Sequence, residues 1–219
     1  MFQLNQVACA YEQKKVFTGL DLEIRQGQYV MLMEESGRIL FLGKDLKEWL
    51  KDKRQKRDFY SRLGILFQDV DSQLFNSTVY DEIAFGPRQL GLTEEEVSQR
   101  VQDTLSLLKI EDLRDRVPYQ LSGGEKKKVA FASIMVTNPD VYILDEPFNN
   151  LSKEYEEFFR ELLHELHSAG KTIIMSAHHF KHLHHEKADV LLFEDGKADF
   201  FPAQEVLNNQ QVIERLSHY

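Results

Sequence analysis

Two short stretches of the chain combine residue types that could bind and process a phosphate ester. Ser122, Gly123 and Gly124 precede a segment with helical periodicity, so their backbone N–H groups would lie at the start of a helix. Glycines allow a charged ligand to approach the backbone closely, and the serine hydroxyl adds one more donor. A bare Ser-Gly-Gly would be interpreted as a helix N-cap, but the acidic stretch that follows favours a phosphate site.

That second stretch is the pair Asp145 and Glu146, directly after the apolar run 141–144. The run predicts a buried strand, which would bring both carboxylates to the carboxyl edge of a sheet, where α/β folds bind ligands. Because adjacent side chains on a strand point to opposite faces, the two acids can have different tasks. Asp145 could orient Mg²⁺ through its water shell, and Glu146 could position a water in line with a γ-phosphate.

The chain resembles an ATP-binding-cassette (ABC) ATPase over nearly its whole length. The glycine turn at 121–125 and the acidic strand end at 141–147 carry the resemblance most specifically. The segments 71–75 and 84–87 most resemble the energy-coupling-factor branch, which drives vitamin and metal-ion importers. The resemblance implies an α/β ABC-type ATPase domain with a mainly parallel central sheet, an N-terminal antiparallel β subdomain and a helical subdomain.

The resemblance also implies catalytic and metal-binding residues. Glu146 would activate water, and His178, just after the apolar run 173–175, would contact the γ-phosphate. Asp145 and Gln68, the latter following Ile65-Leu66-Phe67, would bind Mg²⁺. The implied activity is ATP hydrolysis coupled to transport, with ATP and Mg²⁺ as cofactors.

Nucleotide contacts and partners follow from the same resemblance. Tyr11 matches the aromatic residue on which adenine stacks, although a strand tyrosine is the alternative, and Ser122, Gly123 and Gly124 would clamp the nucleotide of an opposing subunit. The partners would be a sister ABC ATPase subunit, in a homo- or heterodimer, and an integral membrane transporter subunit. The expected location is cytoplasmic, on the inner face of the cell membrane.

The family's phosphate loop has no counterpart in the sequence. It should follow the strand-like run 29–33, but Glu34-Glu35-Ser36-Gly37 stands there and puts two negative charges where anion-binding amides belong. Two further departures are Ser152, where the family has an aspartate that contacts the other subunit, and Glu125, where glutamine is frequent. Three interpretations stay open: a degenerate subunit, an internally shortened product, or a sequence that joins stretches separated in a longer chain.

The function expected from these observations is the nucleotide-binding subunit of an ABC importer of energy-coupling-factor type, degenerate in its own ATP site. The alternative is a non-catalytic regulatory or scaffolding pseudo-ATPase that completes the ATP site of a partner. In either case residues 1–219 are predicted to form a single ABC ATPase domain, with the helical subdomain at about 71–122.

Periodicity predicts the elements that must position these residues. Alternation in 2–4, 15–17 and 20–24 indicates half-buried strands, and 29–33 and 38–42 read as two strands joined by a tight turn. Helical spacing predicts helices over 93–108, from 122–124 to about 138, and over 153–168. Strands at 141–144 and 172–175 alternate with the helices, which implies a parallel sheet.

Composition limits the class of protein. A net charge of -9 argues against binding to nucleic acid, which needs a positive field. The longest apolar runs are about four residues, far below a bilayer span. The run from Lys47 to Arg57 is rich in cations but interrupted by acids, and we expect a solvated face whose charges pair with one another rather than a patch for phosphates or lipids.

Overall fold

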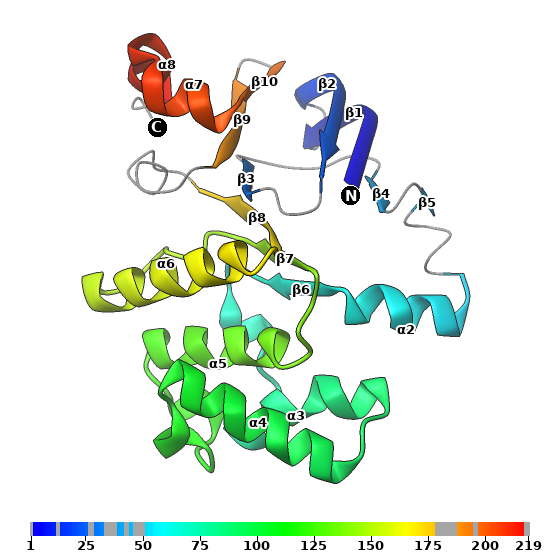
Figure 1. The fold of residues 1–219 in the computed structure, drawn as a ribbon, viewed down its shortest axis with the longest axis vertical. Helices are drawn as coiled ribbons and strands as arrows, with labels where there is room; N and C mark the ends of the chain where they lie inside the picture. The colour runs from blue at the N-terminus through cyan, green and yellow to red at the C-terminus, as the bar shows by residue number, and fades with distance from the viewer. Residues whose placement is uncertain are drawn as a thin grey trace. The chain divides into compact units, whose positions relative to one another are not determined.

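A computed structural model describes residues 2–11, 14–25, 29–32, 39–41, 44–45, 51–177, 188–194 and 197–216 of the chain (Figure 1). The chain forms two compact units. The first comprises Met1–Lys56 with Leu163–Tyr219, and the second comprises Arg57–Leu162. The helices α2 (Lys53–Ser61) and α6 (Lys153–Ser168) begin in one unit and end in the other.

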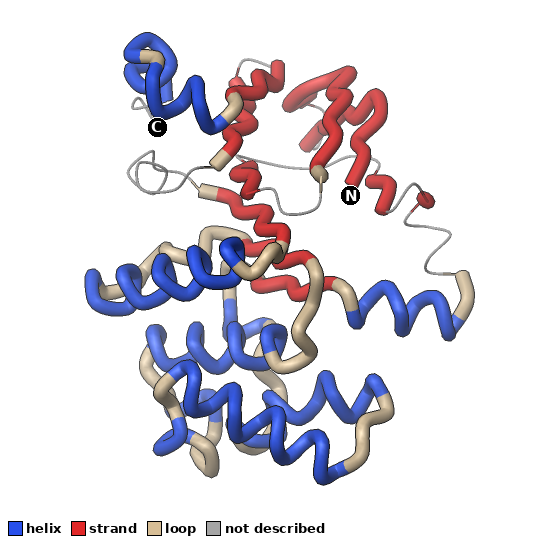
Figure 2. The backbone as a smooth tube through the Cα atoms, viewed as in Figure 1, coloured by secondary structure: helices blue, strands red, loops and turns tan. Residues whose placement is uncertain are grey.

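An antiparallel sheet in the first unit has the strand order β2-β1-β4-β5, drawn among the red strands of Figure 2. The long strands β1 (Phe2–Tyr11) and β2 (Lys14–Ile24) pair from Phe2 opposite Ile24, with register shifts between Leu4 and Ala10. The short strands β4 (Ile39–Phe41) and β5 (Lys44–Asp45) complete the sheet. The predicted antiparallel β subdomain is therefore confirmed.

Parallel strands make up the other sheet of the first unit. β3 (Tyr29–Leu32) lies between β8 (Thr172–Ser176) and β9 (Asp189–Glu194), parallel to both. β10 (Lys197–Phe201) pairs antiparallel with β9 and leads to α7 (Ala203–Asn208) and α8 (Gln210–Leu216). The predicted pairing of 29–33 with 38–42 is wrong, because β3 and β4 belong to different sheets.

The second unit is helical apart from two parallel strands. Its helices are α3 (Val79–Leu90), α4 (Glu94–Leu108) and α5 (Gly123–Met135), which contact one another in pairs, together with the last part of α2 and the first part of α6. Short 3-10 turns at Val70–Ser72, Glu111–Leu113 and Pro118–Gln120 connect them. Thr93 and Glu96 form the predicted capping box of α4.

The two strands of this unit pair in parallel and so bring together the loops that follow them. β6 (Leu63–Leu66) and β7 (Val141–Leu144) pair in register from Leu63 opposite Val141 to Leu66 opposite Leu144. The Asp145 N–H donates to the Leu66 carbonyl oxygen at 2.9 Å, so the pairing continues one residue beyond β7. Parallel strands have their carboxyl ends at the same edge, so the loops after Leu66 and Leu144 begin side by side.

Sequence periodicity anticipated α4, α5, β7, α6 and β8 closely but gave no prediction for α3. That helix contains Pro87, a residue that argues against a helix interior, and it buries a carboxylate, Glu82, together with its apolar residues. The single domain over 1–219 with a helical subdomain at about 71–122 stays a prediction. No helix among the described residues is long and apolar enough to cross a membrane.

The Tyr142 side chain is buried within the second unit, where its ring stacks on Phe131 with centroids 5.9 Å apart. Its hydroxyl has no hydrogen-bond partner within the part of the chain that the structure describes. We therefore expect Tyr142→Phe to leave the free energy of unfolding unchanged or to raise it by up to about 1 kcal/mol, because no bond is lost.

The same substitution should change the response to alkali. Burial raises the pKa of Tyr142, so the unfolded chain ionises first, and stability falls as the pH rises above about 10. Tyr142→Phe removes that contribution, so the free energy of unfolding of this variant, measured in urea, should increasingly exceed that of the wild type above pH 10. Tyr60→Phe, at a half-exposed position, should match the wild type. A loss of several kcal/mol at neutral pH would contradict the expectation.

Candidate functional site

Gln68 and Glu146 meet where β6 and β7 end. Gln68 follows β6 by two residues, Glu146 follows β7 by two residues, and the Gln68 Nε2 donates to the Glu146 Oε2 at 3.0 Å. Gln68 is exposed, whereas Glu146 is only 9% exposed. Asp145 lies between β7 and Glu146 and is exposed. The structure thus brings together a predicted metal ligand and the predicted catalytic carboxylate.

The backbone at Glu146 adopts a conformation that side-chain-bearing residues rarely take. Its φ of 43° is in the left-handed region, as is the 59° of Asn150. Such a conformation costs of order 1–3 kcal/mol and persists only where the surrounding structure holds it. Asn149 helps to fix the backbone and the side chain of Glu146. Its Nδ2 donates to the Glu146 Oε2 at 2.8 Å, and its N–H donates to the Glu146 carbonyl oxygen at 3.1 Å. Two amides therefore fix the orientation of one carboxylate.

Lys127 supports this loop from α5. Its side chain is buried, and its Nζ donates to the carbonyl oxygens of Glu146, at 3.3 Å, and of Asn149, at 3.0 Å. Burial lowers the pKa of Lys127, and the nearby acids Glu146 and Asp145 oppose that shift. The sequence interpretation missed Lys127 and Asn149. The available signal was spacing, because Lys127 follows Gly123 by four residues and so shares its helix face.

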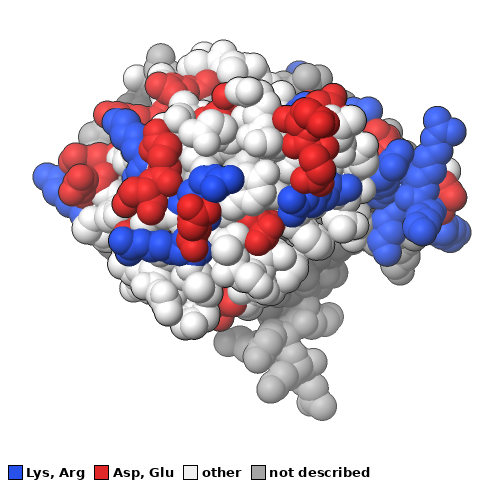
Figure 3. Space-filling view, turned by 90° about the horizontal axis from the view of Figure 1, so that it is seen from below, with Lys and Arg blue, Asp and Glu red and all other residues white. Residues whose placement is uncertain are grey.

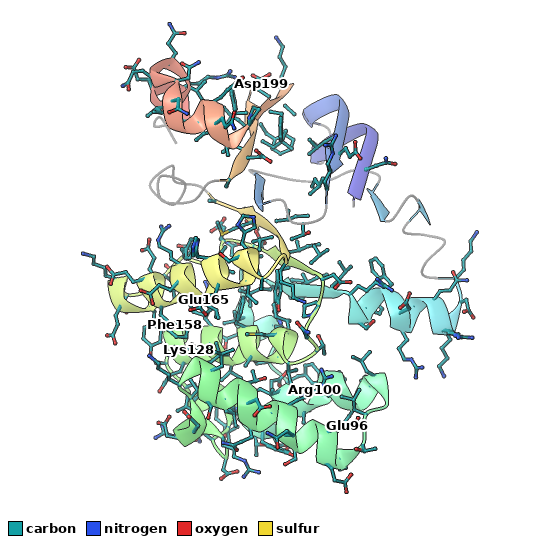
Figure 4. All side chains as sticks on the ribbon, viewed as in Figure 1. Glu96, Arg100, Lys128, Phe158, Glu165 and Asp199 are labelled. Atoms are coloured by element: carbon teal, nitrogen blue, oxygen red, sulfur yellow. The ribbon has the colours of Figure 1, made fainter. Side chains whose placement is uncertain are left out.

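Helix α5 is itself anchored on both sides through Lys128. The Lys128 Nζ donates to the Leu108 carbonyl oxygen at the end of α4, at 3.1 Å, and lies 4.2 Å from the centre of the Phe158 ring on α6. Figure 4 shows Lys128 of α5 and Phe158 of α6 close together. These contacts set the position of the N-terminal turn of α5, which carries the glycine pair.

Ser122 caps α5 and is exposed. Its hydroxyl donates to the Glu125 Oε2 at 2.6 Å, its N–H donates to the same oxygen at 2.8 Å, and the Glu125 N–H donates back to the Ser122 Oγ at 3.4 Å. The bond from the Ser122 hydroxyl lowers the pKa of Glu125. The capping role and an anion-binding role are compatible in space, but a phosphate would have to displace this carboxylate.

The two glycines of the turn have different surroundings. A Cβ atom added at Gly123 would meet nothing within 4 Å, whereas one at Gly124 would lie 3.0 Å from ring carbons of Tyr155. Gly124 thus allows the Tyr155 ring of α6 to pack closely against the turn. Gly123 leaves backbone open to solvent.

One cavity of about 310 Å³ adjoins part of this site, although Asp145, Glu146 and Ser122 do not line it. It is lined by Gln68, Asp69, Val70, Gly123, Lys127, Asn149, Asn150 and Leu151. The side-chain amides of its lining residues and the buried Lys127 ammonium group suit an anion. Asp69 in the lining, and Glu146 bonded to Gln68, offer the hard carboxylate oxygens that Mg²⁺ prefers. The residues present therefore fit a phosphate with its Mg²⁺.

The remaining predicted residues are only partly described. Tyr11 ends β1, but its side chain lies outside the described part of the structure. His178 and residues 33–38, where a phosphate loop was expected, also lie outside the described residues.

Comparisons with known proteins agree with this architecture. A family profile described as ABC transporter matches residues 19–149, more than half of the chain. An ABC transporter ATP-binding protein of Clostridium acetobutylicum is 39% identical over 203 residues, with 84% of each chain covered. The energy-coupling factor transporter ATP-binding protein EcfA of Carboxydothermus hydrogenoformans is 34% identical over 179 residues, covering 82% of this chain and 64% of the relative.

A solved structure matches almost the whole chain. It is cbiO1 of Clostridium perfringens, part of the ABC transporter complex cbiONQ, with a TM-score of 0.77 and 27% identity over 98% of this chain and 93% of that one. The fold is that of an ABC ATPase domain. The chain belongs to the ABC transporter family.

The support that Lys127 gives to the loop can be tested by Lys127→Met, which keeps the length of the side chain but removes its donors. One buried and one part-buried carbonyl group lose a partner, so we expect a loss of about 1–3 kcal/mol in the free energy of unfolding. Lys153→Met, at an exposed position on α6, should change it by less than about 0.5 kcal/mol.

The pH dependence of unfolding gives a second readout of Lys127. Because the folded-state pKa is lowered, the unfolded chain binds more protons just below pH 10, and wild-type stability should rise with pH through that interval. Lys127→Met should lose this rise. Equal slopes in denaturant unfolding from pH 8 to pH 10 would contradict the expectation.

Proposed function

We propose that the chain is the nucleotide-binding subunit of an ABC importer of energy-coupling-factor type, which couples ATP binding and hydrolysis to substrate uptake. The observation that carries the proposal is the hydrogen bond of 3.0 Å between Gln68 and Glu146 at the ends of neighbouring parallel strands. The similarity to EcfA and to cbiO1 of the cbiONQ complex supports the importer class.

Each site residue has a role in this proposal. Asp145 and Gln68 hold Mg²⁺, which when bound neutralises phosphate charge. Glu146 orients the attacking water, since Gln68 and Asn149 hold its carboxylate in one orientation. His178 contacts the γ-phosphate.

Nucleotide recognition is shared between two subunits. Tyr11 stacks on adenine, while Ser122, Gly123 and Gly124 clamp the nucleotide held by a sister ATPase subunit, in a homo- or heterodimer. The exposed Ser122 and the open backbone of Gly123 support that role. The chain's own ATP site is degenerate, because residues 33–37 read Met-Glu-Glu-Ser-Gly instead of a phosphate loop.

The remaining partner is an integral membrane transporter subunit, which places the chain in the cytoplasm, on the inner face of the membrane. Exposed aromatic rings near Gln68 support such a contact. Phe67 is 50% exposed, and Phe75 and Phe85 form an exposed edge-to-face pair with centroids 5.1 Å apart. The buried Glu82 carboxylate accepts from the Phe75 N–H at 2.9 Å and so fixes the loop that presents the ring.

The second candidate is a non-catalytic regulatory or scaffolding pseudo-ATPase that completes a partner's ATP site. The absence of a phosphate-loop sequence favours it, because Ser122 to Gly124 can serve a partner's nucleotide without the chain holding its own. The two candidates differ in which residues a functioning complex needs.

Two variants distinguish the candidates in the complex that co-purifies with this chain from membranes. If Glu146 positions the attacking water when the degenerate site works within the complex, Glu146→Gln should lower kcat by at least about 100-fold with little change in KM. If it completes a partner's site, Glu146→Gln should leave kcat within about threefold, whereas Gly123→Ala should lower it. Neither variant changing turnover would contradict both candidates.

The isolated chain provides a further prediction. Because a phosphate loop is missing, we expect at most marginal turnover of Mg·ATP by the chain alone. Turnover that persists through purification and disappears in Glu146→Gln would contradict the degenerate site.

The two glycines form a matched pair for testing the clamp. Gly123→Ala places a methyl group in open space, so it should leave the free energy of unfolding within about 1 kcal/mol but weaken ATP-dependent association with the sister subunit. Gly124→Ala forces the Tyr155 ring to move and should destabilise the fold by about 1–3 kcal/mol. Unchanged association in Gly123→Ala would count against the clamp.

A further inference from the structure

Helix α2 exposes a concentration of positive charge on a chain whose net charge is -9. Lys53, Arg54, Lys56 and Arg57 are all exposed. In the space-filling view of Figure 3 the right-hand edge, where α2 lies in Figure 1, is dominated by blue side chains, whereas blue and red are mixed over the rest of that face. The helix therefore differs from the remainder of the visible surface.

Helical geometry places three of these cations on one face of α2, from which the Arg57 Nη1 extends to within 3.8 Å of the position that a Cβ atom at Gly91 would take. At about 100° per residue, Lys53, Lys56, Arg57 and Tyr60 follow the spacing i, i+3, i+4 and i+7 and lie on one side of the helix. Phe59, on another side, is 5% exposed and anchors the helix. Arg54 flanks the face, and no acid lies within it.

The acids that interrupt this stretch in sequence do not neutralise it. Asp52 caps the helix, and its Oδ2 accepts from the N–H groups of Arg54 and Gln55, each at 3.2 Å. Asp58 is directed to Arg62, whose Nε lies 3.4 Å from its Oδ1. Among the described residues, no ion pair involves the four cations of α2. The expected self-pairing of this stretch is therefore wrong for its described part.

Apolar groups accompany the charge. The Tyr60 ring is 50% exposed and lies on the same side of the helix as Lys56 and Arg57. Aromatic rings next to lysine and arginine are typical of segments that lie at the interface between a membrane and water.

We propose that the exposed face of α2 binds the anionic headgroups of a lipid membrane surface. Each Lys or Arg near such a surface contributes about 1 kcal/mol, so four cations suffice for reversible binding. The negative charge elsewhere does not prevent it, because charges farther away than the Debye length of about 8 Å are largely screened at physiological salt.

Size favours a lipid surface over nucleic acid. From Lys53 to Tyr60 the helix rises only about 10 Å, which covers few phosphates of a duplex. A membrane interface also accommodates the exposed ring of Tyr60. The inference concerns a different surface from Ser122 to Gly124, so tests of the ATP site can fail without affecting it.

The test measures co-sedimentation of the full chain with vesicles of phosphatidylcholine containing about one third phosphatidylglycerol, against phosphatidylcholine alone. One variant replaces Lys53, Arg54, Lys56 and Arg57 by Gln. The matched control replaces four exposed cations outside α2, Lys109, Arg116, Lys153 and Lys197, by Gln, with the same change in net charge. Circular dichroism verifies that both variants are folded.

The wild type should partition to anionic vesicles at least about tenfold more strongly than to neutral ones, and the α2 variant should lose that preference. The control variant should stay within about threefold of the wild type. Trp49 is the only tryptophan, so a blue shift of its fluorescence on anionic vesicles gives a local readout that needs no substitution. Raising the salt to about 0.5 M should reverse the shift.

Three results would overturn the proposal. Equal losses in both variants would indicate an effect of net charge alone. Equal binding to neutral and anionic vesicles would show that the headgroup charge does not contribute to the binding. Binding of a DNA or RNA duplex at least as strongly as anionic vesicles, lost in the α2 variant, would assign the face to nucleic acid instead.

Discussion

The site depends on the parallel pairing of β6 with β7. This ladder, extended by the bond from the Asp145 N–H to the Leu66 carbonyl, makes two segments almost eighty residues apart in sequence leave the sheet side by side. The hydrogen bond between Gln68 and Glu146 follows from that placement. Without the ladder, Gln68 would not reach Glu146, and the carboxylate would keep only the amide of Asn149 from its own loop.

The loop after β7 is held in a conformation that its own residues do not favour. Glu146 and Asn150 have positive φ values, and the Lys127 ammonium binds two carbonyl groups of the loop from a buried position. A buried lysine is costly unless it finds such partners, and burial lowers its pKa. Lys127 and the loop therefore stabilise each other, which keeps Glu146 oriented before any ligand arrives.

The same helix that carries Lys127 presents the glycine turn. Lys128 anchors α5 to α4 and α6, and Gly124 permits close contact with Tyr155, so Gly123 and Ser122 are displayed at a defined position. Glu125 occupies the donors of Ser122 in the free chain. A phosphate supplied by a second subunit would compete with an internal carboxylate, which gives the proposed clamp a preference for highly charged ligands.

The sequence by itself determined the family, the antiparallel strands at the N-terminus, the capped helix α4 and the strand with its two acids, because local periodicity and short motifs encode them. It did not reveal α3, which contains Pro87, or the separation of β3 and β4 into different sheets. Nor did it reveal the roles of Lys127 and Asn149, or that Asp52 caps α2 instead of pairing with its cations. These features depend on which distant segments meet in space, and only the tertiary structure decided that.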